Sequence, residues 1–200
     1  MTVLARVHPE AFAPLHRLTV DEVMRMVEVG VLRPNQPVEL IDGVLVDMAS
    51  EGWLHIGVKA RLIRWLMVNA PEELAVIPDS TLHLPPHDAP EPDCYVYPAS
   101  VRLEDLKGPD VLLVVEVADS SLGYDTKFKA PFYGRFGVQE CWVLDLVHNR
   151  VLVHRRPTAH GYDVVDTFAA GDPIEVPGFR KTLTLRDLLQ DPTSPEARVT

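Results

Sequence analysis

The sequence predicts a mixed α/β (α+β) domain in which helices flank a mixed central β-sheet. One observation is a strand, a helix and a second strand within residues 111–145, the pattern of a right-handed parallel crossover unit. The other is the pair Asp42-Gly43 between two strand-like segments, which is typical of an antiparallel hairpin with a type I′ turn. Parallel and antiparallel pairing together indicate a mixed sheet.

The first third of the chain should hold a short leading helix, the hairpin and a longer helix. Thr19 and Glu22 have the spacing of a capping box, and apolar residues follow at helical intervals. The hairpin covers residues 38–48. From about residue 55 to 70 apolar side chains recur with helical periodicity, and Pro71 ends the pattern. This second helix should cover the sheet.

The remaining elements follow in order along the chain. Candidate strands cover residues 74–77, 81–84, 93–97, 111–118 and 139–145, with a later hairpin at 150–154 and 162–168. A helix is predicted at 125–136 although it contains Pro131, which fits only near a first turn or at a kink. A short helix at 184–189 closes the chain. We expect one domain over residues 1–200, with a core at about 17–190 and flexible ends.

Composition restricts the classes of function. The formal net charge of −10 argues against a protein that coats nucleic acid through bulk electrostatics, but a local basic site remains open. Cys94 and Cys141 are far apart in strand-like segments, so neither a disulfide framework nor a cysteine metal cluster is indicated. No stretch approaches the length of a membrane-spanning helix. We therefore expect a cytoplasmic protein that is neither exported nor membrane-spanning.

Glu116 is the most informative residue, because it stands within the otherwise apolar strand 111–118. A buried, ionised carboxylate costs several kcal/mol unless a metal or another cation compensates it. Asp125, Lys129 and Tyr133 follow at intervals of four and should share one face of the next helix. With Asp93 at the start of another strand, these residues predict a metal site with a lysine beside it.

The chemistry suggested is metal-assisted phosphodiester hydrolysis. Mg²⁺ typically takes oxygens from one or two carboxylates and from a substrate phosphate, and Asp93 and Glu116 supply that minimum. Glu39 on the hairpin could add a third acid. Lys129 would orient the attacking water or screen charge near the scissile phosphate. His55, at the start of the covering helix, could face this site, but a partly buried structural histidine is the favoured interpretation.

Several short patterns occur in a fixed order. They are Glu39-Leu-Ile-Asp-Gly43, His55, Pro92-Asp93, Val115-Glu116-Val117 and Asp125-x-x-x-Lys129-x-x-x-Tyr133-x-x-x-Gly137. In this order and spacing the chain resembles the Uma2 family of the PD-(D/E)XK restriction-endonuclease-like superfamily. The resemblance covers nearly the whole chain. It implies a restriction-endonuclease-like core and a Mg²⁺-dependent nuclease site, with Mn²⁺ as the alternative ion.

The resemblance also assigns roles. The metal ligands would be Asp93 and Glu116, the further catalytic residues Lys129 and Glu39, and the accessory residues His55, Asp125 and Tyr133. The superfamily motif has lysine two residues after its acid, where this chain has Ala118. In Uma2-like sequences the lysine is moved to the following helix, which makes Lys129 the candidate. Lys127 should point roughly the opposite way and is the weaker choice.

Purely structural interpretations compete with these roles. Asp125 and Lys129 could be a solvated helix pair worth a few tenths of a kcal/mol. Glu116 could instead pair with an arginine of the covering helix, either Arg61 or Arg64.

The other two acids have structural alternatives as well. Asp93, which follows a proline, could merely start a strand or cap a turn. Glu39 could be an exposed hairpin residue opposite Leu45 or Asp47. For Glu39 the structural and functional interpretations are evenly balanced.

The leading hypothesis is a Mg²⁺-dependent endonuclease that hydrolyses phosphodiester bonds of DNA, acting as a homodimer where two strands are cut. One alternative is a non-catalytic nucleic-acid-binding or regulatory protein that keeps the fold. Another is a metal-dependent hydrolase of a small phosphate ester, suggested by the acidic net charge.

Overall fold

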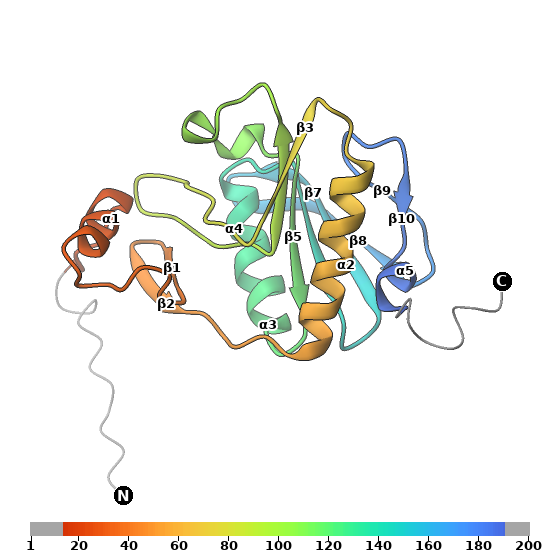
Figure 1. Ribbon diagram of the computed structural model, residues 1–200, viewed down its shortest axis with the longest axis horizontal. Coiled ribbons are helices and arrows are strands. Elements are labelled where there is room, and N and C mark those ends of the chain that lie inside the picture. Colours follow the sequence, from red (N-terminus) through yellow and green to blue (C-terminus); the bar gives the residue numbers. More distant parts are fainter. Residues whose placement is uncertain (1–13, 191–200) are drawn as a thin grey trace, which may run out of the picture. The chain divides into compact units, whose positions relative to one another are not determined.

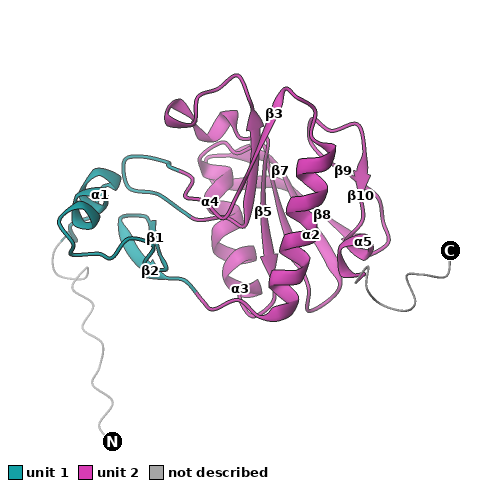
Figure 2. Cartoon of the chain, in the orientation of Figure 1, with its two compact units in different colours: residues 1–48, 83–90 teal, residues 49–82, 91–200 magenta. Residues whose placement is uncertain are grey.

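The computed structural model describes residues 14–190, which divide into two compact units (Figure 2). Unit 1 holds the residues up to 48 together with 83–90, and unit 2 holds 49–82 and the residues from 91 onward. The predicted flexible ends lie mainly outside the described residues. The assignment of the whole chain to one domain stays a prediction.

Unit 1 contains the predicted leading helix and hairpin. Helix α1 (Val20–Glu28) begins with the expected capping box, in which the Thr19 hydroxyl accepts from the Glu22 N–H and the Glu22 carboxylate accepts from the Thr19 N–H. Strands β1 (Val38–Ile41) and β2 (Val44–Asp47) are antiparallel. Asp42 and Gly43 have φ of 52° and 75°, and a type I′ turn requires positive φ at both positions.

The predicted strand at residues 81–84 is wrong. Leu84 makes only an isolated bridge with Asp88. Pro85 and Pro86 follow directly, and prolines have no N–H group to donate to a sheet ladder. The chain therefore turns here instead of continuing as a strand.

Unit 2 is built around a six-stranded sheet of order β3-β4-β5-β6-β7-β8. The strands are β3 (Leu74–Pro78), β4 (Cys94–Pro98), β5 (Leu113–Ala118), β6 (Glu140–Asp145), β7 (Arg150–Thr158) and β8 (Gly161–Ala169). Only β5 and β6 pair in parallel within this sheet, and the other neighbours are antiparallel. The predicted mixed sheet is confirmed.

Helices cover both faces of this sheet (Figure 1). Helix α2 (Trp53–Asn69) packs on one face, where its buried side chains join Val115 and Val117 of β5 in the core. Because successive strand residues point to opposite faces, Glu116 faces the other side. Helix α4 (Ala130–Arg135) packs there against β6, β7 and β8.

Smaller elements complete unit 2. They are η2 (Leu103–Asp105), η3 (Gly108–Asp110), α3 (Leu122–Tyr124), β9 (Ile174–Glu175), β10 (Thr182–Leu183) and α5 (Leu185–Leu189). The last of these is the predicted final helix, and its Thr184 cap accepts from the Asp187 N–H.

The helical segment between β5 and β6 differs from the regular helix predicted at 125–136. It starts earlier, with α3, and continues through a π-helical turn, η4 (Asp125–Lys129), into α4. The Ala130 N–H donates to the Asp125 carbonyl, five residues back. Pro131 has no N–H, and its ring would clash with the carbonyl four residues earlier in a regular α-helix, so the wider turn accommodates it.

Gly134 marks the closest approach of α4 to the sheet. A Cβ atom at this position would lie 2.4 Å from the Gly161 carbonyl oxygen at the start of β8. The three nearest atoms, O, C and Cα of Gly161, all belong to the backbone, which cannot move aside cheaply. Gly134→Ala should therefore lower the free energy of unfolding by about 1–3 kcal/mol in denaturant titrations. Gly123→Ala is the control, because nothing lies within 4 Å of its Cβ, and equal midpoints for the two variants would contradict this packing.

Candidate active site

Two predicted acids meet on neighbouring strands of unit 2. Cys94 of β4 pairs with Val115 of β5, and continuing this antiparallel register by one residue places Asp93 across from Glu116. The Asp93 carboxylate also accepts a hydrogen bond from the Val117 N–H, with an N–O distance of 2.6 Å. Both acids are buried. The sheet thus brings together the two carboxylates that the sequence proposed as metal ligands.

Lys129 and Tyr133 both contact the Glu116 carboxylate. Lys129 Nζ lies 2.9 Å from Glu116 Oε1, and the Tyr133 hydroxyl donates to the same oxygen at 2.6 Å. Lys129 is only 5% exposed, so its interpretation as part of a solvated helix pair is wrong. Glu116 pairs with this lysine, whereas Arg61 donates to the Leu188 carbonyl, so the expected alternative of a structural arginine partner is also wrong.

Asp125 and Lys127 differ in their surroundings. Asp125 is buried and accepts a hydrogen bond from the Ser121 hydroxyl. Lys127 is exposed, as expected for the weaker lysine candidate. Lys129 also donates to the Glu91 carbonyl at 3.4 Å, which helps to fix its ammonium group.

The surroundings of Glu116 disfavour its charged form. Burial raises the pKa of Glu116 to about 8, and the charges of Asp93 and Asp125 act in the same direction. Lys129 and the Tyr133 hydroxyl lower the pKa but do not offset the burial. A divalent cation would favour the ionised carboxylate, so Glu116 would release its proton when the cation binds.

The metal-free protein should lose stability as the pH rises from about 5 to 8. The folded-state pKa of Glu116 is raised from its ordinary value of 4.5 to about 8, so the folded state binds more protons in this window. This contribution to the free energy of unfolding is present below pH 4.5 and is lost as the pH passes through 8, by on the order of 5 kcal/mol in full. Urea titrations at several pH values measure it.

Glu116→Gln removes the titrating group and should flatten this pH dependence. Glu28→Gln, at an exposed glutamate of α1, should leave it unchanged. An equally steep loss of stability in Glu116→Gln would assign the effect to another group.

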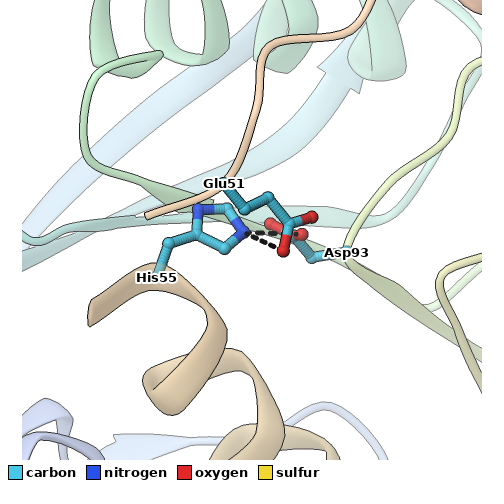
Figure 3. Close-up of side chains that lie close together, drawn as sticks. All are labelled: Glu51, His55 and Asp93. Carbon is cyan, nitrogen blue, oxygen red and sulfur yellow. Dashed lines mark hydrogen bonds and ion pairs between the residues drawn. The ribbon is translucent and has the colours of Figure 1, made fainter. Parts of the chain in front are cut away.

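His55 lies in the first turn of α2 and faces Asp93 and Glu51 (Figure 3). Its Nε2 is 3.1 Å from Asp93 Oδ1 and 3.7 Å from Glu51 Oε2. Burial opposes protonation, but the hydrogen bond and charge of Asp93 and the charge of Glu51 raise the pKa of His55 overall. His55 is buried, as the structural interpretation required, yet its ring contacts a proposed metal ligand.

Lys59, one turn further along α2, is a site residue that the sequence analysis missed. Its Nζ lies 2.5 Å from Glu51 Oε1, 2.7 Å from Asp79 Oδ1 and 3.4 Å from Asp93 Oδ1. Burial opposes the charge, but hydrogen bonds to Asp79 and Glu51 raise the pKa of Lys59 above its ordinary value. The available signal was the spacing of four from Glu51 to His55 to Lys59, which repeats the spacing around Lys129.

The lysine and histidine of α2 also act on Asp93. Burial raises the pKa of Asp93, but the hydrogen bond and charge of His55, the Val117 N–H and the charge of Lys59 outweigh it and lower the pKa. Asp93 is therefore ionised at neutral pH, in contrast to Glu116.

The donor set fits a divalent cation. Ligand atoms of Glu51, His55 and Asp93 lie within 4.8 Å of one another. The whole cluster holds five carboxyl groups and two ammonium groups, which leaves a charge of −3 when Glu116 is ionised and His55 is neutral. Its members are Glu51, Asp79, Asp93, Glu116 and Asp125 with Lys59 and Lys129. Oxygen donors with excess negative charge are what Mg²⁺ and Mn²⁺ require.

Glu39 belongs to unit 1, whereas the residues above belong to unit 2. It is buried on β1 and pairs in register with Val46, so its interpretation as an exposed residue opposite Leu45 or Asp47 is wrong. Its role as an accessory acid stays a prediction.

Known protein families include one that matches most of this chain. The family model Uma2, described as "Putative restriction endonuclease", matches residues 20–187. The chain belongs to the Uma2 family. Uma2 membership confirms the resemblance inferred from the sequence and supports a nuclease function. No curated protein matched the chain.

A solved structure shares the fold of this Uma2 protein. It is a crystal structure of "a putative nuclease belonging to DUF820" from Anabaena variabilis, with a TM-score of 0.66 and 17% sequence identity. The match covers 86% of this chain and 97% of that one. At this identity the likeness concerns the fold alone. Within residues 14–190, no helix combines the length and the apolar character needed to cross a membrane.

Proposed function

We propose that this protein is a divalent-metal-dependent endonuclease that hydrolyses phosphodiester bonds of DNA, with Mg²⁺ or Mn²⁺ as the ion. The observation that carries the proposal is the placement of Asp93 across from Glu116 with the Lys129 ammonium 2.9 Å from the Glu116 carboxylate. Two acids on neighbouring strands with a lysine of the following helical turn beside them suit phosphodiester hydrolysis, because the reaction needs a bound cation and a further positive charge near the phosphate.

Asp93 and Glu116 would hold the ion, which when bound supplies a more acidic water and neutralises charge on the phosphate. Asp93 is oriented for this by the Val117 N–H and by His55. Tyr133 orients Glu116 through its hydroxyl.

Lys129 would position the attacking water and stabilise negative charge that develops on the phosphate. Its side chain is held by Glu116 and by the Glu91 carbonyl, so the ammonium group is fixed before substrate arrives. A donor fixed in advance costs no reorganisation during the reaction. The net charge of −10 means that DNA would be engaged at this local site and not through general attraction.

A substrate panel tests the proposal. Supercoiled plasmid, single-stranded DNA, RNA and bis(p-nitrophenyl) phosphate are incubated with Mg²⁺, Mn²⁺ or EDTA. We expect metal-dependent cleavage of the plasmid and none in EDTA. Cleavage of the small ester alone would favour a phosphate-ester hydrolase, and metal binding without any cleavage would favour a non-catalytic protein. Sedimentation of the same preparation checks the predicted homodimer.

A further inference from the structure

The cluster around Asp93 has two sides that could each take a cation. Glu116, with Lys129, lies across from Asp93 on β5. On the other side, Glu51, His55 and Lys59 gather around Asp93 Oδ1. Two-metal hydrolytic sites have this arrangement, with ions about 3.5–4 Å apart sharing a carboxylate.

The second side already holds a cation, which is the Lys59 ammonium. It contacts three carboxylates at once, those of Glu51, Asp79 and Asp93. Lys59 is buried, and its ammonium is anchored through a long side chain from the middle of α2. Three acids around one point would repel one another without a positive charge between them.

A divalent ion and this ammonium cannot share the position. Mg²⁺ binds oxygens at about 2.0–2.1 Å and requires close to six of them. The Lys59 ammonium already lies 2.5 Å from Glu51 Oε1 and 2.7 Å from Asp79 Oδ1, both of which accept hydrogen bonds from it. An ion could enter only if the ammonium left, and its departure would break three ion pairs, those with Glu51, Asp79 and Asp93.

We propose that Lys59 is a positioning residue whose ammonium fills the second cation position beside Asp93, so that the site takes one divalent ion and not two. The part of this inference that concerns the first ion rests on the proposed function. The part that concerns Lys59 does not, because it predicts that the Lys59 variant binds one more ion than wild type whether wild type binds one ion or none.

Counting bound Mn²⁺ tests the inference without any activity measurement. Mn²⁺ is titrated into the full chain, and the free ion is followed by electron paramagnetic resonance. Wild type should bind one ion. Lys59→Met should bind one more, because the ammonium no longer fills the position beside Glu51, His55 and Asp93, whose ligand atoms lie within 4.8 Å of one another. The additional ion should bind at least tenfold more tightly than any second ion in wild type.

Two further variants make the result decisive. Lys127→Met removes an exposed lysine by the same substitution and should bind as many ions as wild type. Lys59→Met combined with Asp79→Asn restores the net charge of wild type and keeps the three potential ligands. It should also gain an ion, and it serves where Lys59→Met does not fold.

The outcomes separate the two proposals. No gain of an ion in either Lys59 variant, or two ions in wild type, overturns the role of Lys59. No ion in wild type but one in the Lys59 variants supports that role and overturns the metal dependence in the proposed function.

Discussion

Asp93→Asn should abolish metal-dependent cleavage, with a loss of at least about a thousandfold, and should weaken Mn²⁺ binding by at least about tenfold. Asparagine keeps an oxygen that can accept from the Val117 N–H, so the local backbone should be preserved. What it loses is the charge shared by the ion and the α2 side chains His55 and Lys59. Plasmid cleavage and Mn²⁺ titration on the same preparation measure both effects.

An exposed aspartate of β8 provides the control for this variant. Asp163→Asn removes the same charge outside the cluster and should retain the wild-type rate and affinity. If Asp93→Asn cleaves plasmid at the wild-type rate, the activity comes from a contaminant or from another site, and the assignment of Asp93 is wrong.

Lys129→Met should reduce cleavage by about 10²–10⁴-fold while Mn²⁺ binding changes much less. The substitution keeps an unbranched side chain, one atom shorter, in the buried position but removes the charge next to Glu116. Because Lys129 lowers the pKa of Glu116, that pKa should rise further in the variant, and metal binding should then need a higher pH. Single-turnover cleavage and Mn²⁺ titrations between pH 6 and 9 measure these changes.

Lys127→Met is the matched control, since it removes a lysine from the same π-helical turn at an exposed position. Its cleavage rate should equal that of wild type. Should Lys129→Met retain more than about a tenth of the wild-type rate while folded, Lys129 would be a structural partner of Glu116 and not a catalytic residue.

Local patterns in the sequence predicted much of the fold because they are governed by neighbouring residues. The capping box at Thr19 and the Asp42-Gly43 turn need no tertiary information, and both occur as expected. The buried acid Glu116 was informative for the same reason, since its strand and the helix after it are consecutive along the chain.

Contacts between distant elements could not be predicted in this way. Lys59 meets Asp79 only because α2 packs beside the end of β3, and no spacing rule relates a helix residue to an aspartate twenty positions later. Asp79 itself has a φ of 43°, a conformation that its sequence neighbours do not indicate. The contacts of Lys59 with Asp79 and Asp93 therefore emerged only from the three-dimensional arrangement.

The π-helical turn gives the segment before α4 the character of an insertion within a helix. A π-turn contains about one residue more than an α-turn, so deleting a single residue such as Thr126 would restore regular winding. The same deletion would leave Asp125 three residues before Lys129 in a regular α-helix, a spacing that still places both residues on one face. The extra residue is absorbed within the turn, so the elements on either side keep nearly the same orientation. A one-residue gap at this place in an alignment of relatives would accordingly be compatible with the same active site, although the spacing from Asp125 to Lys129 would be three residues and not four.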